Sequence, residues 1–349
     1  HPAFAAAVLM EAESGAVLFG YNEHEPRSPA STQKLLLQLV VMDLVKAGKF
    51  SLEEPVSVSA RASRMGGSQV FLKQGEEFSL DEMMEAIAIP SANDACVAVA
   101  EHVGGSAAGF VDMMNQRSAD LGLTGTRCVN VHGLDDTPKQ HSNHTTAHDL
   151  ARVGQGLLTH PEILQWSAVR YKPFRDGKFM LYNTNNLLGR FRGLDGLKTG
   201  YTKRAGSCLV ATAKRGDMRL ISVVLGCDNE KIRNAETARL LSWGFNNFSR
   251  VPIVHEGETM GTVALDWGME PEVRALTGTA AVAVLSTRQE KQIRRQIDLP
   301  NERPAPVQAG EELGTLSVSL GDSVLAEVDV VAAKTVERMG LWDKFLSYF

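Results

Sequence analysis

The feature that most constrains this chain of 349 residues is a long apolar run, Leu35 to Val45, which is entered through a proline. Proline favours the first turn of a helix, so the segment from Pro29 onward predicts a helix that begins near Ser31. A helix that is apolar on nearly every side must be buried. The sequence therefore predicts a large core built around this helix.

Ser31 and Lys34 lie at the start of that helix, and their spacing of three residues places both side chains on one face. Unpaired backbone N–H groups gather at a helix start and stabilise negative charge there. A lysine that has lost its proton through burial can accept the proton of a serine hydroxyl. The pair predicts a nucleophile with its own base. The commoner meaning of this spacing is structural, a capping serine and a surface lysine, so other motifs must support the prediction.

The composition is that of an ordinary globular protein, with 44% hydrophobic and 22% charged residues. A chain of this length can form one large core and a smaller one, so we expect two domains. The formal net charge of -5 and the lack of a basic block argue against a nucleic-acid partner. No uninterrupted apolar run reaches about 18 residues, so no membrane-spanning helix is expected. The chain begins at His1 rather than Met, which indicates a processed or trimmed N-terminus.

The cysteines and histidines are the residues from which a metal or redox site could be built. Neither a C-x-x-C pair nor a zinc-finger spacing occurs among the four cysteines, whose number permits disulfides without requiring them. Cys208 and Cys227 flank the predicted hairpin and could lie close together, and we expect two free buried thiols. His141, His144 and His148 have helix-like spacing, which raises the possibility of a zinc site. A helix start at Thr145-Thr146 would break their common face, and no H-E-x-x-H motif is present. We therefore expect no metal and no other cofactor.

Two further short motifs follow along the chain. Ser91-x-Asn93 lies between two predicted helices, the first opened by a capping box at Ser79-Leu80-Asp81-Glu82. Both side chains could face a cleft there, although Ser91 could instead be an ordinary N-cap. Lys198-Thr199-Gly200 precedes a hairpin over residues 209–225 and is predicted on a strand at a sheet edge, where Gly200 lets a ligand backbone approach.

The C-terminal part of the chain has a different character. From about Val251, short segments of alternating hydrophobicity separated by turn residues predict a small all-β module. At the end of the chain Trp342, Phe345, Leu346 and Phe349 share one apolar helical face. Such a helix either docks on protein or lies on a membrane surface, and its balanced charges leave both alternatives open.

Each of the three motifs is weak alone, but together they are specific. Ser31-x-x-Lys34, Ser91-x-Asn93 and Lys198-Thr199-Gly200 occur once each and in this order. The same trio, commonly with Asp in the middle of the second motif, is the signature of class A β-lactamases and penicillin-binding proteins.

Around the trio the chain resembles one family, the D-alanyl-D-alanine carboxypeptidases of the low-molecular-mass penicillin-binding proteins. The resemblance covers nearly the whole chain. It rests on Pro29-Ala30-Ser31-Thr32-Gln33-Lys34, Pro90-Ser91-Ala92-Asn93-Asp94-Ala95, Leu121-Gly122-Leu123, Asn130-Val131-His132-Gly133-Leu134, Asn183-Thr184-Asn185, Asp195-Gly196-Leu197-Lys198-Thr199-Gly200-Tyr201-Thr202, Leu240-Leu241-Ser242-Trp243-Gly244-Phe245, Ala305-Pro306-Val307 and Gly310 to Gly314.

The resemblance implies an α/β fold with a β-lactamase/transpeptidase-like α/β/α catalytic domain, a small all-β domain and a C-terminal amphipathic helix. We place these parts at residues 1–248, 249–334 and 335–349. It also implies a place in the periplasm or on the outer face of the cytoplasmic membrane, with peripheral contact through the end helix. The implied partners are the D-Ala-D-Ala end of peptidoglycan pentapeptides and β-lactam antibiotics.

The resemblance also implies roles for individual residues. Ser31 would be acylated by the penultimate D-Ala carbonyl of a stem peptide, which releases the terminal D-Ala, and Lys34 would be its base. Ser91 would relay a proton to the leaving amine with Lys198 close by, and Asn93 would hold the substrate amide.

The remaining implied roles concern binding. Thr199 and Lys198 would bind the terminal carboxylate, and Arg233 is placed like a family arginine that assists them. The backbone N–H groups of Ser31 and Tyr201 would form the oxyanion hole. Two residues depart from the family pattern, Ala92 where relatives often carry Gly and Tyr201 where some carry His.

Four alternatives remain. A class A β-lactamase shares the trio but needs a glutamate to activate the deacylating water, and Glu162 stands in a poor match to that element. A D,D-endopeptidase uses the same residues and differs only beyond the scissile bond. A non-enzymatic cell-wall scaffold would keep the trio without using it, and a zinc peptidase would use the histidines.

Overall fold

The structure is a computed structural model, and it describes the chain except for residues 1, 136–137, 139–141 and 341–349. The chain divides into two compact units, His1–Asn246 and Asn247–Phe349. Within the described residues no helix is both long and apolar enough to cross a membrane.

The first unit is built on a five-stranded antiparallel sheet with the order β2-β1-β9-β8-β7. Its strands are β1 (Ala6–Glu11), β2 (Val17–Tyr21), β7 (Leu194–Thr202), β8 (Gly206–Arg215) and β9 (Met218–Cys227). The hairpin predicted over residues 209–225 is confirmed as β8–β9, and β1 pairs with β2 in the same antiparallel way. Strand β7 lies at the edge of the sheet, as predicted for the Lys198-Thr199-Gly200 motif.

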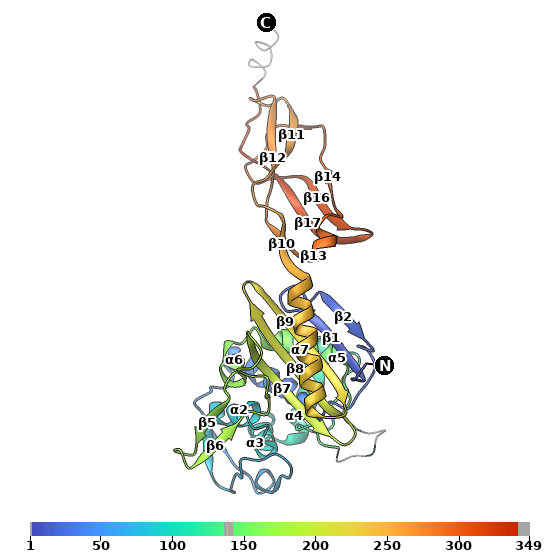
Figure 1. Cartoon of the computed structure of the whole chain (residues 1–349). Helices are drawn as coiled ribbons and strands as arrows, with labels where there is room; N and C mark the ends of the chain where they lie inside the picture. The colour runs from blue at the N-terminus through green and yellow to red at the C-terminus, as the bar shows by residue number, and fades with distance from the viewer. Residues whose placement is uncertain (1, 136–137, 139–141, 341–349) are drawn as a thin grey trace. The chain divides into compact units, whose positions relative to one another are not determined.

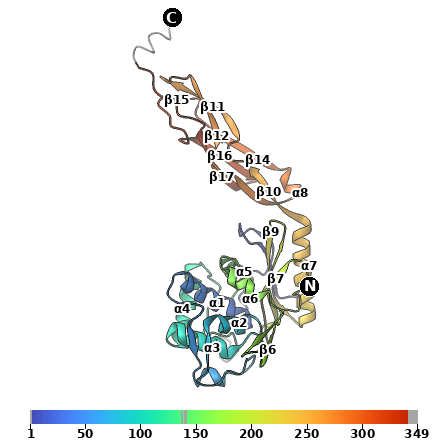
Figure 2. The ribbon, with the colours of Figure 1, turned by 90° about the vertical axis from the view of Figure 1, so that its left-hand side faces the viewer.

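Helices cover both faces of this sheet. Figures 1 and 2 show α7 (Glu230–Asn247) on one face and α5 (Ala147–Leu157), with the remaining helices behind it, on the other. The remaining elements of the unit are η1 (Ala30–Gln33), α1 (Lys34–Lys46), β3 (Pro55–Ser57), η2 (Ala62–Arg64), β4 (Glu77–Ser79), α2 (Leu80–Ala88), α3 (Asn93–Gly104), α4 (Ala107–Asp120), α6 (Pro161–Ser167), β5 (Tyr171–Phe174) and β6 (Phe179–Tyr182). The expected α/β/α layering is confirmed.

Local sequence signals set several helix starts. The side chain of Ser79 accepts a hydrogen bond from Glu82 N while Glu82 bonds back to Ser79 N, so the predicted capping box is present. Thr146 caps α5 through Asp149 N, as the sequence predicts. These caps satisfy backbone N–H groups that a helix leaves unpaired at its first turn.

Helix α1 forms the centre of the core but does not begin where the sequence predicts. Residues 35–42 are all buried, which confirms the central helix. The segment Ala30–Gln33 is a 3-10 turn, and the α-helix starts only at Lys34. Ala30 has a φ of +48°, which a side chain disfavours and which is incompatible with a continuous α-helix.

The second unit is all β, as predicted. Its larger sheet has the order β14-β16-β17-β12-β11-β15, and β10 pairs with β13. Its strands are β10 (Phe248–Val254), β11 (Thr259–Asp266), β12 (Glu272–Thr277), β13 (Ala281–Ser286), β14 (Ile293–Asp298), β15 (Glu302–Pro304), β16 (Glu312–Leu320) and β17 (Ser323–Ala332), with one short helix, α8 (Thr287–Glu290). The unit has a core of its own, which includes Val263, Leu316 and Val330.

The helix predicted over residues 335–349 does not begin at its expected start. Val336 pairs with Val307, and Arg338 pairs with Gly268, as isolated β-bridges. Backbone hydrogen bonds to the body of the β unit therefore replace helical ones in this stretch. The rest of the predicted helix, residues 341–349, lies outside the described residues.

Gly133 illustrates how tightly the chain is packed around η1. It has a φ of +82°, and a Cβ placed on it would lie 1.9 Å from the carbonyl oxygen of Ala30. We predict that Gly133→Ala lowers the free energy of unfolding by about 3 kcal/mol, because strain and a backbone clash add together. Chemical denaturation measures this loss.

Gly48→Ala is the matched control for this prediction. Gly48 also has a positive φ, +69°, but no atom lies within 4 Å of the position that a Cβ would take. Only the strain contributes there, so a loss of about 1 kcal/mol is expected. Equal losses for the two variants would contradict the close contact between Gly133 and Ala30.

Candidate active site

Ser31 lies on the 3-10 turn, which is held from two sides. The side chain of Gln33 donates a hydrogen bond to Asn130 O, and the hydroxyl of Thr32 donates one to Pro29 O at 2.6 Å. On the other side the edge strand β7 approaches so closely that a Cβ on Gly200 would lie 3.0 Å from the backbone nitrogens of Ser31 and Thr32. Gly200 therefore allows the turn to approach the strand.

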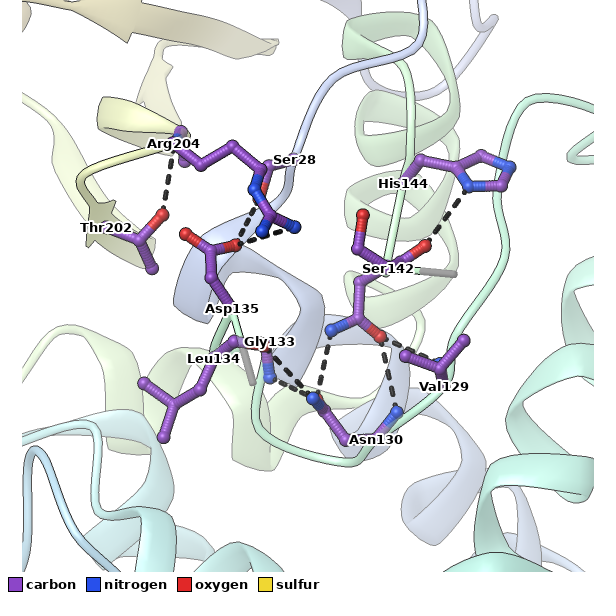
Figure 3. A network of polar contacts seen from close by, with 12 residues as sticks. Ser28, Val129, Asn130, Gly133, Leu134, Asp135, Ser142, His144, Thr202 and Arg204 are labelled. Carbon is purple, nitrogen blue, oxygen red and sulfur yellow. Dashed lines mark hydrogen bonds and ion pairs between the residues drawn. The ribbon is translucent and has the colours of Figure 1, made fainter. Parts of the chain in front are cut away.

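A loop behind the turn completes its support. Asn130 accepts a hydrogen bond from Gly133 N at 2.8 Å and another from the side chain of Asn143 at 3.0 Å. Figure 3 shows Asn130, Gly133 and Leu134 on this loop, which continues to Asp135 beside Ser28. The loop bonds fix Gly133 against Ala30, so the position of Ser31 is set by contacts distant in sequence.

Lys34 joins the first two motifs. Its side chain is wholly buried, and Nζ lies 3.2 Å from Ser31 Oγ, 3.0 Å from Ser91 Oγ, 2.6 Å from Ser91 O and 2.7 Å from Asn93 Oδ1. All four partners are uncharged oxygens. Burial lowers the pKa of Lys34, and the electrostatic effects of Cys96 and Asp94 oppose this shift only in part. The site therefore favours the neutral amine, which is the form that can accept a proton.

Ser91 and Asn93 are held at the junction of α2 and α3. Ser91 has a φ of +69°, and the N-cap of α3 is Ala92, which makes no side-chain cap. This excludes the alternative that Ser91 is an ordinary N-cap. Asn93 uses its side-chain oxygen for Lys34 and donates from Nδ2 to Gly66 O at 2.7 Å, which fixes the orientation of its amide.

Lys198 and Thr199 bring the third motif to the same place. Both are buried, and the hydroxyl of Thr199 lies 2.5 Å from that of Thr184. Lys198 Nζ makes one hydrogen bond within the described chain, to Thr199 O at 3.3 Å. Burial, followed by the charge of Lys34, holds the pKa of Lys198 well below its usual value. An arriving carboxylate would relieve this cost, so the site is suited to an anionic ligand group.

Tyr201 and Arg233 stand at the margin of the site. Tyr201 follows Gly200 on the edge strand, and its side chain is 64% exposed. Arg233 is buried on α7, and its guanidinium bonds the side chain of Asn234 at 2.9 and 3.1 Å. Its charge contributes to the lowered pKa of Lys198. The structure therefore places Arg233 within electrostatic reach of the site but shows it bonded to Asn234.

Asp94 is a residue of the site to which the sequence analysis assigned no role. Its buried carboxylate accepts hydrogen bonds from Val70 N at 3.2 Å and Leu72 N at 3.0 Å. Asn93 N donates to Ser68 O in the same loop at 2.7 Å. The sequence signal that could have indicated a role is its position next to Asn93, at the start of an apolar helix. Its partners could not be identified from local pattern.

The histidines and cysteines show no metal site in the described part of the chain. No group of three His, Cys, Asp or Glu side chains gathers there, and His141 lies outside it. All four cysteines are buried and free, as expected for Cys208 and Cys227. Burial raises the pKa of Cys96 and of Cys208 to about 11, so these thiols remain protonated.

The chain is similar to known proteins along most of its length. Residues 3–229 match the family model described as D-alanyl-D-alanine carboxypeptidase, which is more than half of the chain. The chain belongs to the D-alanyl-D-alanine carboxypeptidase family. Residues 248–338 match the model of the penicillin-binding protein 5 C-terminal domain.

Curated relatives extend over almost the whole chain. The D-alanyl-D-alanine carboxypeptidase DacF of Bacillus subtilis is 36% identical over 97% of this chain and 90% of its own length. DacC of Escherichia coli is 35% identical over 98% of this chain and 87% of its own length. The chain is therefore a serine-type D-alanyl-D-alanine carboxypeptidase, a hydrolase, as the sequence predicts.

Solved structures confirm the fold. Penicillin-binding protein 5 of Haemophilus influenzae has a TM-score of 0.80 and 28% identity, covering 97% of this chain and 98% of the other. Penicillin-binding protein D2 of Listeria monocytogenes, solved in an ampicillin-bound form, has a TM-score of 0.64 and 31% identity. It covers 70% of this chain and 98% of its own. The predicted α/β catalytic domain with a C-terminal β domain is confirmed.

We predict that Lys198→Met abolishes carboxypeptidase activity and yet stabilises the fold. Lys198 has few hydrogen bonds to lose, and Met removes a desolvated ammonium, so a gain on the order of 1 kcal/mol is expected at pH 7. The folded-state pKa is lowered, so the unfolded chain binds more protons below the usual lysine pKa. The advantage of Met should therefore shrink as the pH rises toward 10.5. Urea denaturation at several pH values tests this; a destabilised variant at pH 7 would contradict it.

We predict that Asp94→Ala destabilises the fold by about 2–4 kcal/mol, because it leaves buried N–H groups of Val70 and Leu72 without acceptors. The loop that holds Asn93 should also loosen, so the variant should lose at least about tenfold in kcat/KM. Asp112→Ala, at an exposed position of α4, serves as the control and should change stability by less than about 0.5 kcal/mol. Normal stability and activity in Asp94→Ala would show that the loop is held by other contacts.

Proposed function

We propose that this carboxypeptidase removes the terminal D-alanine from peptidoglycan stem peptides through an acyl-enzyme on Ser31. The observation that carries the proposal is the position of Lys34. Its buried amine lies within hydrogen-bonding distance of Ser31 Oγ, at 3.2 Å, and of Ser91 Oγ, at 3.0 Å. One group of lowered pKa therefore contacts both hydroxyls that the reaction requires.

In the acylation step Ser31 Oγ attacks the carbonyl carbon of the penultimate D-Ala, and neutral Lys34 takes the hydroxyl proton. The negative charge that develops on the carbonyl oxygen is stabilised by the backbone N–H groups of Ser31 and Tyr201. The close approach of Gly200 to Ser31 N supports this pairing. Ser91 passes a proton from Lys34 to the leaving nitrogen as the C–N bond breaks, and free D-Ala departs.

Substrate is held by groups on either side of the nucleophile. The hydroxyl of Thr199 and the ammonium of Lys198 bind the terminal carboxylate, and the fixed amide of Asn93 holds the peptide amide. Arg233 contributes its positive charge from α7. In deacylation Lys34 takes a proton from water as the water oxygen attacks the ester carbonyl. The bond between the carbonyl carbon and Ser31 Oγ then breaks, Lys34 returns the proton to Oγ, and the shortened peptide leaves with a new terminal carboxylate.

β-Lactams are expected to acylate the same serine. The Listeria monocytogenes penicillin-binding protein D2 has been solved in ampicillin-bound and cefotaxime-bound forms, which supports this proposal. Among the described residues Lys34 hydrogen-bonds only uncharged oxygens, whereas class A β-lactamases need a glutamate for rapid deacylation. We therefore propose that a bound penicillin is released slowly.

We predict that benzylpenicillin gives a persistent adduct of whole-drug mass, which peptide mapping places on Ser31. The same protein should release D-Ala from an acylated peptide ending in D-Ala-D-Ala. Ser31→Ala should lose the adduct and about 10³-fold or more of the D-Ala release, since the nucleophile is gone. Intact mass spectrometry over time and a D-Ala assay are the measurements.

Three outcomes would overturn the proposal. Rapid hydrolysis of the drug would identify a β-lactamase, and an unreacted drug with no D-Ala release would support a scaffold role. Cleavage of cross-linked peptides without release of terminal D-Ala would identify an endopeptidase.

We further propose that the chain acts outside the cytoplasm, in the periplasm or on the outer face of the cytoplasmic membrane, where peptidoglycan lies. The apolar spacing of Trp342, Phe345 and Phe349 supports peripheral membrane contact. Flotation with phospholipid vesicles tests the contact, using the chain with and without residues 341–349. Equal flotation of the two forms would contradict it.

A further inference from the structure

A polar pocket lies next to the proposed active site, and the proposed mechanism does not use it. Its volume is about 330 Å³, and the exposed Tyr201 forms part of its wall. Its charged and hydroxyl-bearing side chains come from three other segments. These are Arg27 and Ser28 before the nucleophile, Lys203 and Arg204 in the β7–β8 turn, and Asp228 after β9. The pocket therefore collects three cationic groups against one acidic group.

Two of these cations have an acidic partner, and one has none in the described part of the chain. Arg27 pairs with Glu25 at 2.8 Å, but its buried Nε makes no hydrogen bond to any described residue. Lys203 is exposed and forms no ion pair in the described part of the chain. Arg204 faces Asp135 at 3.8 Å, which is beyond hydrogen-bonding distance, while Asp135 accepts a hydrogen bond from Ser28 at 3.1 Å. Figure 3 shows Ser28, Asp135 and Arg204 together.

The direction of the bound substrate decides which part of it would reach this pocket. The edge of β7 is available for an extended peptide to lie along it. In the proposed mechanism the scissile carbonyl faces Tyr201 N, and the carboxylate one residue later faces Thr199. The substrate then runs antiparallel to β7. Residues before the penultimate D-Ala continue past Tyr201 toward Lys203 and Arg204.

We propose that this pocket is a subsite for a carboxylate that the substrate peptide carries before its penultimate D-Ala. The subsite rests on the proposed function, because that function sets the direction of the peptide. Lys203 and Arg204 supply the charge, and the buried Nε–H of Arg27 offers a donor. Because Arg204 and Asp135 are 3.8 Å apart, a substrate carboxylate can replace Asp135 beside Arg204.

A second basic pocket provides the control. It has a volume of about 310 Å³ and is lined by Arg170 and Arg190 together with Tyr171, Tyr182 and Asn183. Asn183 adjoins Thr184, which contacts Thr199, so this pocket lies toward the leaving-group end of the site. Replacing its arginines changes the charge of the protein equally but leaves the proposed subsite intact.

The test compares two acetylated peptides that end in D-Ala-D-Ala and differ only in Glu or Gln two residues before the penultimate D-Ala. The unmodified chain should favour the Glu peptide by about tenfold in kcat/KM at low salt, mainly through KM. The preference should shrink as salt rises, because exposed charges are screened. The double variant Lys203→Gln, Arg204→Gln should lose the preference, and Arg170→Gln, Arg190→Gln should keep it.

A preference that survives in the Lys203→Gln, Arg204→Gln variant would overturn the proposal, as would equal kcat/KM values for the two peptides in the unmodified chain. Lys203→Glu provides a second test at one exposed side chain, and it should reverse the preference toward the Gln peptide. Release of no D-Ala from either peptide would instead refute the proposed function itself. The two failures are therefore distinguishable.

Discussion

The site depends on the burial of one amine. Lys34 Nζ lies among Ser31, Ser91 and Asn93 and has no carboxylate within hydrogen-bonding distance among the described residues, so the ammonium form pays for lost hydration without an ion pair to offset it. The charge of Lys34 in turn helps to lower the pKa of Lys198, the other buried lysine of the site. In the proposed mechanism, the shift of Lys34 toward the neutral amine makes the serine hydroxyl a usable nucleophile at moderate pH.

Such an arrangement is unstable by itself and must be imposed by the surrounding fold. Ala30 and Ser91 both have positive φ values, which cost free energy at residues with side chains. Gly133 lies against Ala30, and the carboxylate of Asp94, three residues after Ser91, accepts hydrogen bonds from Val70 N and Leu72 N. Burial of the large core around α1 stabilises the fold and offsets the free-energy cost of this strain.

Much of this could be predicted from sequence, because many of the signals are local. The Ser79 capping box and the edge position of Gly200 follow from short patterns and are confirmed. The 3-10 turn before Lys34 was missed, since the backbone of Ala30 is set by contacts with a loop about a hundred residues away. The hydrogen bonds that Asp94 accepts from Val70 N and Leu72 N were missed for the same reason. Contacts between distant segments leave no periodicity in the sequence.

The most direct test of the account is the pH dependence of acylation by benzylpenicillin, measured as the second-order rate constant for adduct formation. If neutral Lys34 is the base, the rate must rise with pH through the pKa of Lys34. We predict a midpoint below 10.5, the usual value for lysine, because burial favours the neutral form. A midpoint at the usual lysine value, or a rate that does not rise with pH, would contradict the claim that Lys34 is held ready as the base.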